Sequence, residues 1–183
     1  MKIWKEYLAP TTVLTIVCIV VTLALAGTYQ LTNPVIAANA KAAADAARAE
    51  VLPSGEDGYS LVNCKLPEGI TDVYEADNRT GFVITVEDKG FGGKIVVMVG
   101  IGTDGKITGV NVLEHAETPG LGTKAIAESH LSQFMEQGRI TNTNEAGAAN
   151  IDAISGATIS SDAVFRAVDK ALLQYARLGG ANQ

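Results

Sequence analysis

The stretch GFVITVEDKGFGGKIVVMVGIGTDGKITGVNVL, residues 81–113, decides the fold of the chain. Three runs in it are rich in apolar and β-branched residues and predict strands: Gly81–Glu87, Lys94–Ile101 and Lys106–Leu113. The glycine-rich turn Asp88–Gly93 joins the first two runs, and Asp104-Gly105 is a hairpin signal before the third. Strands that follow one another through such short turns predict an antiparallel meander.

A turn and a helix are predicted directly after the meander. Thr118-Pro119-Gly120 predicts a type II turn, because proline sets the first central residue and glycine accepts the positive φ of the second. Gly122 then opens a helix that we expect over residues 123–137. Its apolar side consists of Ile126, Leu131, Phe134 and Met135.

The C-terminal helix is expected from about Ser161 to Leu178, with Ser160 or Ser161 as its N-cap. Asp162 in its first turn and Arg177 in its last complement the helix dipole. Its buried stripe, at helical spacing, is Val164, Val168, Leu172 and Tyr175 or Ala176. The strands and helices together predict an α+β domain in which helices pack on an antiparallel sheet.

The composition excludes several classes of function. The 183 residues are 47% hydrophobic and carry a net charge of −6, which disfavours a nucleic-acid partner. Cys18 and Cys64 form no CxxC pair, and with only His115 and His130 they predict neither an iron–sulfur cluster nor another metal site. No catalytic arrangement is recognisable either, so any redox chemistry requires an organic cofactor.

An uncharged segment near the N-terminus, Leu8–Tyr29, predicts a single transmembrane helix. About 20 such residues cross the hydrocarbon core of a bilayer. A cleaved signal peptide is the alternative, because Ala24-Leu25-Ala26 resembles a cleavage site. The apolar run is long for a signal peptide, and Trp4 and Tyr29 are placed as interfacial anchors, so we predict an uncleaved span.

The basic residues Lys2 and Lys5 orient this span with the N-terminus in the cytoplasm. The remainder of the chain is then expected outside the cytoplasm, anchored in the cytoplasmic (inner) membrane. Asn33-Pro34 marks the exit from the bilayer, and the alanine-rich segment that follows predicts a helical stalk. We expect three parts: residues 1–30 with the span, 31–58 with the stalk and a loop, and 59–183 with the folded domain.

The stretch Asp152–Ser161, DAISGATISS, suggests a site for a phosphate. Small residues let the backbone approach a ligand, and the first N–H groups of the helix that follows have no helical partners. The same pattern is compatible with a plain N-cap. The glycine-rich turn at 90–93 and the loop at 113–122 are likewise either simple connections or ligand contacts.

Three stretches taken together resemble the FMN-binding domain family of membrane redox complexes. They are GFGGKI at 90–95, HAETPGLG at 115–122 and SGAT at 155–158. Their order and the single N-terminal span match the G subunits of Rnf-type ion-translocating oxidoreductases. The C subunits of sodium-translocating NADH:quinone oxidoreductases are similar but usually longer.

The resemblance implies that FMN is bonded through its phosphate to Thr158, the last residue of the SGAT motif. Ser155, Gly156 and Ala157 match the rest of this motif. A separate flavin transferase makes the bond from FAD and a metal ion, and Asp152 matches the upstream acid that it recognises. Ile159 departs from broader versions of the pattern, which often have Ser or Thr there. The loop residues that match the wall of the flavin ring are Glu117, Thr118, Leu121 and Gly122.

The function that the resemblance implies is electron relay within an ion-translocating ferredoxin:NAD⁺ oxidoreductase. The partners would be the other membrane and electron-transfer subunits, and this chain would need no catalytic residues or substrate site of its own. Two alternatives from other classes are an extracytoplasmic flavin-binding sensor and a ligand-binding module on a membrane anchor. The expected cytoplasmic segment of seven residues offers a sensor no output domain.

Overall fold

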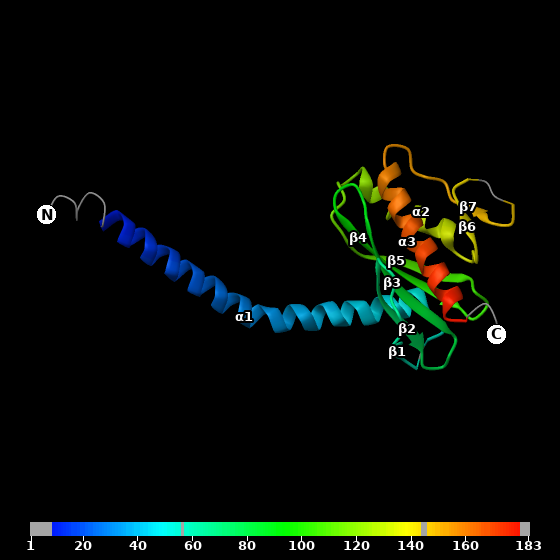
Figure 1. Ribbon diagram of the computed structural model, residues 1–183, viewed down its shortest axis with the longest axis horizontal. Helices are drawn as coiled ribbons and strands as arrows, with labels where there is room; N and C mark the ends of the chain where they lie inside the picture. The colour runs from blue at the N-terminus through cyan, green and yellow to red at the C-terminus, as the bar shows by residue number, and fades with distance from the viewer. Residues whose placement is uncertain (1–8, 56, 144–145, 180–183) are drawn as a thin grey trace. The chain divides into compact units, whose positions relative to one another are not determined.

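The computed structural model describes residues 9–55, 57–143 and 146–179 of the chain (Figure 1). The chain divides into two compact units, residues 1–43 and 44–183, so the predicted stalk is shared between them. Lys2, Lys5 and Trp4, on which the predicted orientation and one interfacial anchor depend, lie outside the described residues. Each unit is considered by itself.

The first unit is formed by helix α1, which spans Ala9–Val51 and continues into the second unit. It is long and apolar enough to cross a membrane, and all its residues from Thr11 to Ala43 are exposed. The helix continues without a break through Asn33-Pro34, the predicted exit from the bilayer. Strong helix formers on the C-terminal side of Pro34 account for this continuity, although proline donates no backbone hydrogen bond.

The second unit contains a five-stranded antiparallel sheet in the order β1-β2-β3-β4-β5. Its strands are β1 (Tyr59–Leu61), β2 (Ile70–Ala76), β3 (Gly81–Lys89), β4 (Lys94–Gly102) and β5 (Ile107–His115). The predicted meander is therefore confirmed as β3, β4 and β5. Gly105 has a φ of 76°, as the hairpin at Asp104-Gly105 requires.

Both faces of the sheet are covered, which explains why β4 is buried almost along its whole length. Helix α3 (Thr158–Arg177) lies across one face and packs on β3 and β4 (Figure 1). Its side chains form the main core with the inward residues of the strands, among them Ile84, Val97, Val99, Val164 and Val168. The last turns of α1 cover the other face with Ala47 and Val51, and Leu52, directly after the helix, packs with them. The predicted α+β class is confirmed.

Two glycines in register let the end of α1 approach the sheet closely. Gly100 on β4 lies opposite Gly109 on β5. A Cβ added to Gly100 would lie 2.2 Å from the carbonyl oxygen of Val51, and one added to Gly109 would lie 2.5 Å from Val51 Cα. The carbonyl of Val51 also accepts a 2.6 Å hydrogen bond from the hydroxyl of Thr108. Any side chain at either glycine would push the helix end away.

The single helix expected over residues 123–137 is wrong. The segment forms three short pieces instead: η2 (Gly122–Lys124), α2 (Glu128–Leu131) and η3 (Ser132–Phe134). After Phe134 the chain turns to the sheet edge, where Glu136 N donates to Ile107 O and Ile107 N donates to Gln137 O. These bonds to β5 end the helical conformation before Gln137.

The predicted N-cap of the C-terminal helix is also wrong. Helix α3 begins at Thr158, three residues earlier than expected, and its N-cap, Ala157, makes no side-chain capping bond. Ser160 and Ser161 are buried in the first turn. The hydroxyl of Ser161 accepts a hydrogen bond from Ile154 N at 3.1 Å, so it stabilises the preceding loop. The predicted buried stripe is confirmed for Val164, Val168 and Tyr175.

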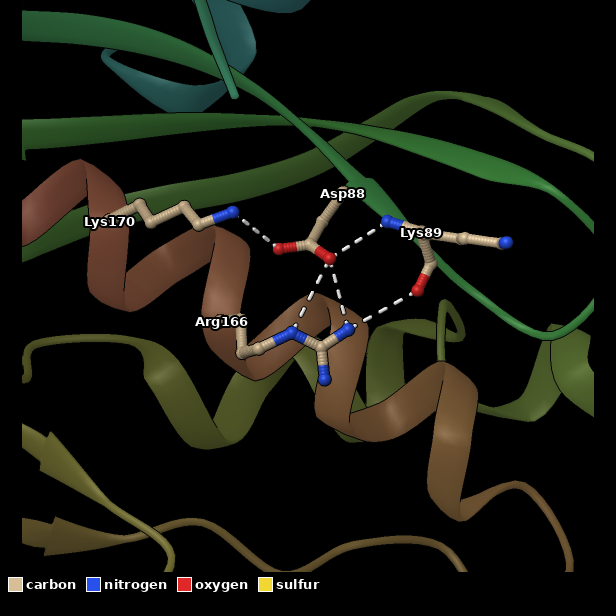
Figure 2. A network of polar contacts seen from close by, with 4 residues as sticks. All are labelled: Asp88, Lys89, Arg166 and Lys170. Carbon is tan, nitrogen blue, oxygen red and sulfur yellow. Dashed lines mark hydrogen bonds and ion pairs between the residues drawn. The ribbon is translucent and has the colours of Figure 1, made fainter. Parts of the chain in front are cut away.

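Helix α3 is joined to β3 by a cluster of charges (Figure 2). Arg166 Nη2 lies 2.9 Å from one oxygen of Asp88, and Lys170 Nζ lies 2.7 Å from the other. Burial alone would raise the pKa of Asp88, but the hydrogen bonds from Arg166 and Lys170 outweigh it and lower the pKa below its ordinary value. Arg166 also donates to the carbonyl oxygen of Lys89, at the start of the loop 90–93.

We predict that Asp88→Asn lowers the free energy of unfolding by about 1–2 kcal/mol at pH 7, because two partly exposed cations lose an ionised partner. Because the pKa of Asp88 is lower in the folded chain than in the unfolded chain, its ionised carboxylate stabilises the fold at every pH above the unfolded pKa. The difference between wild type and variant should therefore persist down to about pH 4 and shrink as the pH falls through the native pKa of Asp88. Urea unfolding of the purified chain in detergent measures both.

Glu87→Gln is the matched control, since it removes an exposed acid 3.8 Å from Lys94 on the same strand pair and should change little. Equal stability of wild type and Asp88→Asn at pH 7, or a difference that grows on acidification, would contradict the assignment.

Candidate functional site

A pocket of about 380 Å³ lies where three segments distant in sequence meet. Its walls come from the loop 90–93, the loop 117–122 and the start of α3. The lining residues are Phe91, Thr118, Leu121, Gly122, Gly156, Ala157, Thr158, Ile159 and Ser160. Most of this surface is apolar, with hydroxyl groups at a few positions. Such a pocket has the size and character of a site for a small organic molecule.

The carboxylate of Glu117 holds the three walls of this pocket together. One oxygen accepts a hydrogen bond from Gly92 N at 3.1 Å, and the other accepts one from the hydroxyl of Ser160 at 2.6 Å. The side chain is only 5% exposed. Glu117, in the loop 117–122, is thus bonded both to the loop 90–93 and to the start of α3.

Glycines lie next to the Glu117 carboxylate because any side chain at these positions would overlap it. A Cβ added to Gly90 would lie 2.2 Å from one of its oxygens, and a Cβ added to Gly122 would lie 2.1 Å from the other. A Cβ on Gly92 would collide with the carbonyl oxygen of Ala116 at 2.1 Å. Gly90 and Gly122 are therefore explained by close packing around one carboxylate, and Gly92 by the neighbouring carbonyl of Ala116.

The turn Thr118–Leu121 forms the outer part of the second wall. Leu121 N donates to Thr118 O at 3.2 Å, and Gly120 has a φ of 77°, which confirms the predicted turn. The hydroxyl of Thr123 accepts a 2.9 Å bond from Gly120 N. This turn presents Leu121, half of whose surface is exposed, at the pocket.

The N-terminus of α3 supplies the polar end of the pocket. The first backbone bond of the helix runs from Ser161 N to Ala157 O at 2.9 Å. The N–H groups of Thr158, Ile159 and Ser160 precede it and have no partner within the helix. Thr158 is exposed and lines the pocket, so its hydroxyl lies beside donors that favour an anion.

The segment before α3, around Asp152, is held by a chain of hydrogen bonds through the short helices η3 and α2. Asp152 N donates to Gln133 Oε1 at 3.0 Å, while Gln133 Nε2 lies 3.1 Å from Nδ1 of the buried His130. Burial lowers the pKa of His130. Asp152 itself is exposed, and its carboxylate accepts a 3.1 Å bond from the side chain of Asn150. The main chain of Asp152 is thus fixed while its side chain remains accessible.

The structure brings most of the predicted site residues together at one pocket. Thr118, Leu121, Gly122, Gly156, Ala157 and Thr158 all line it. Ser155 is exposed but does not line the pocket, and Glu117 lies behind its wall. Asp152 lies outside the pocket as well. The roles assigned to these residues stay predictions.

Sequence reasoning missed three lining residues, Phe91, Ile159 and Ser160. Phe91 is 67% exposed and lies in a glycine-rich turn at the pocket. An aromatic residue between glycines was the available signal for a ligand contact. Ser160 gave no such signal, because its burial depends on Glu117, 43 residues earlier in the chain.

The residues present fit FMN. An apolar pocket with an exposed aromatic side chain suits a planar ring, and a hydroxyl beside unpaired N–H groups suits a phosphate. In the described residues no three His, Cys, Asp or Glu side chains gather as metal ligands.

Comparison with known proteins agrees with this fit. Residues 90–173 match the family described as FMN-binding domain, and residues 1–51 match the RnfG N-terminal region. The chain therefore contains an FMN-binding domain behind an apolar N-terminal helix.

Two relatives of nearly full length identify the family. The G subunit of the proton-translocating ferredoxin:NAD(+) oxidoreductase complex of Clostridium ljungdahlii is 34% identical, over 91% of this chain and 90% of the relative. The G subunit of the Na(+)-translocating complex of Acetobacterium woodii is 29% identical, over 96% and 94%. The chain belongs to the family of Rnf complex G subunits. Because α1 is long and apolar enough to cross a membrane and the chain belongs to this family, α1 is a membrane anchor.

Two solved structures are similar in part. NqrC of Shewanella oneidensis is 26% identical with a TM-score of 0.42, over 55% of this chain and 52% of that chain. The C subunit of the Na(+)-translocating NADH-quinone reductase of Parabacteroides distasonis is 20% identical with a TM-score of 0.48, over 69% and 65%.

Proposed function

We propose that this chain carries FMN bonded covalently to Thr158 and relays electrons within an ion-translocating ferredoxin:NAD⁺ oxidoreductase complex. The observation that carries the proposal is the pocket at which the three predicted stretches meet, with Thr158 exposed at the N-terminus of α3. The names of its relatives support the complex, and the match to the FMN-binding domain supports the cofactor. FMN supplies the electron-transfer chemistry that the side chains of this domain lack.

The residues around Thr158 suit a phosphodiester bond. In its formation Thr158 Oγ bonds to the FMN phosphorus of FAD, the phosphoanhydride bond breaks, AMP leaves, and the hydroxyl proton passes to a base or water on the flavin transferase. The N–H groups of Ile159 and Ser160 can then stabilise the remaining phosphate charge. Gly156, with a φ of 83° and open space around it, lets the preceding loop turn away from the acceptor.

The apolar walls suit the flavin ring. Leu121 and Phe91 present exposed apolar surface from two different loops, and Gly122 adds a surface without a side chain. Thr118 offers a hydroxyl at the same wall. An open pocket of this kind leaves one edge of the ring accessible, as transfer of electrons to and from neighbouring carriers requires.

The proposal includes an orientation. Lys2 and Lys5 favour a cytoplasmic N-terminus, which places the flavin domain on the other side of the cytoplasmic membrane, next to other subunits of the complex. A C-terminal alkaline phosphatase fusion should therefore be active in cells, since this enzyme folds only outside the cytoplasm. An inactive, stably expressed fusion would contradict the orientation.

We predict that Thr158→Val abolishes covalent flavin and leaves the domain folded. The substitution removes one hydroxyl from an exposed position and keeps the side-chain volume, so the free energy of unfolding should change by less than about 0.5 kcal/mol. The measurement is in-gel flavin fluorescence after SDS electrophoresis of chain co-expressed with flavin transferase.

Thr118→Val is the matched control, because it removes a hydroxyl from the facing wall of the same pocket. It should retain the fluorescent band. A band of wild-type intensity in Thr158→Val would refute Thr158 as the acceptor, and its absence from the wild type would refute covalent flavin altogether.

We also predict that Asp152→Ala lowers the rate of flavinylation at least tenfold while Thr158 remains intact. The Asp152 N–H to Gln133 bond involves the main chain and survives the substitution, so the loop should keep its position. Flavin incorporation into purified apoprotein by transferase, FAD and Mg²⁺ measures the rate. Asp162→Ala is the control, because Asp162 is an acid on the other side of Thr158 and its loss should leave the rate unchanged. A wild-type rate in Asp152→Ala would make Asp152 merely structural.

A further inference from the structure

We propose that Glu117 is a buried negative charge that holds down the reduction potential of the flavin in this pocket. The inference rests on the proposed function, because it concerns the same pocket and the same cofactor. It assigns to Glu117 an electrostatic role through the pocket wall in place of direct contact with the flavin ring.

The hydrogen bonds of Glu117 suit a negatively charged carboxylate, because both of its oxygens act as acceptors. Each oxygen accepts a bond, one from the N–H of Gly92 and one from the hydroxyl of Ser160. Both donors are neutral, and the described residues include no Lys, Arg or His in an ion pair with Glu117. The two dipoles stabilise the charge without cancelling it.

The carboxylate lies directly behind the surface that a ligand would touch. Ser160, which lines the pocket, donates to it over 2.6 Å. Gly122, which also lines the pocket, approaches it so closely that an added Cβ would lie 2.1 Å from the second oxygen. Only the thickness of one residue separates the charge from the pocket.

A fixed negative charge at this distance opposes reduction of a flavin. Reduction adds an electron, and the repulsion between that electron and the carboxylate lowers the potential unless a cation or water screens it. Glu117 is 5% exposed, so screening by water is weak. For a separation of about 12 Å at an effective dielectric constant of about 20, or about 6 Å at about 40, the repulsion changes the equilibrium constant of a one-electron reduction by roughly tenfold.

Glu117→Gln removes this charge and keeps the contacts. The amide oxygen can accept the Gly92 N–H bond. The amide nitrogen can donate to the hydroxyl of Ser160, whose proton is free to turn away. The variant is therefore expected to fold and to carry flavin like the wild type.

The experiment is a dye-mediated redox titration of the full-length chain, co-expressed with flavin transferase, purified in detergent and followed by flavin absorbance. We expect Glu117→Gln to raise the midpoint potential of the first electron by about 59 mV, which corresponds to the tenfold change. In-gel fluorescence measures the flavin content of each variant, so that potentials are compared on flavin-loaded chains.

Ser160→Ala is the control that separates charge from packing. It breaks the bond between two walls of the pocket but leaves the charge, which then has one stabilising dipole fewer. If Glu117 acts through its charge, the potential of this variant stays the same or falls. If Glu117 merely keeps the pocket closed, Ser160→Ala, which breaks one of its bonds, admits water and raises the potential at least as much as Glu117→Gln, which keeps them.

An unchanged potential in Glu117→Gln, or an equal rise in Ser160→Ala, would overturn the inference. Either result leaves the proposed function intact, because the wild type still carries flavin. A wild-type chain without flavin would instead contradict the proposed function and this inference with it.

Discussion

The hydrogen bonds of one buried carboxylate determine the geometry of the candidate site. Glu117 receives Gly92 N–H from one loop and the Ser160 hydroxyl from the first turn of α3. Leaving the buried Ser160 hydroxyl or the buried carboxylate without a partner would cost about 1–3 kcal/mol, so these bonds stabilise the assembly of the three segments. The glycines at positions 90 and 122 follow from the same constraint, since side chains there would occupy the space of the carboxylate.

The sheet supplies the rigid frame for this arrangement. Helix α3 lies on one face, joined to β3 by Asp88, Arg166 and Lys170, and the last turns of α1 lie on the other. The loop 90–93 begins where β3 ends, and the start of α3 lies beside it. Within this unit the end of α1 packs closely on the sheet, with Val51 against Gly100 and Gly109.

The strands were predictable because their signals are local: alternation, β-branched residues and the Asp104-Gly105 turn. The helix boundaries were not, since contacts distant in sequence decide them. Residues 136 and 137 leave the helical conformation to bond with Ile107, and Ser160 is buried by Glu117 in place of capping α3. The site residues were found through motifs, whereas Phe91 was missed because its loop resembles an ordinary turn.

The most direct test of the central claim is the mass of one peptide from the wild-type chain. Trypsin releases Ile140–Arg166, which contains Thr158 and no internal lysine or arginine. After purification from cells that contain a flavin transferase, this peptide should be heavier by one FMN less one water, and fragmentation should place the addition on Thr158. A peptide of unmodified mass, or an addition on another residue, would contradict the account.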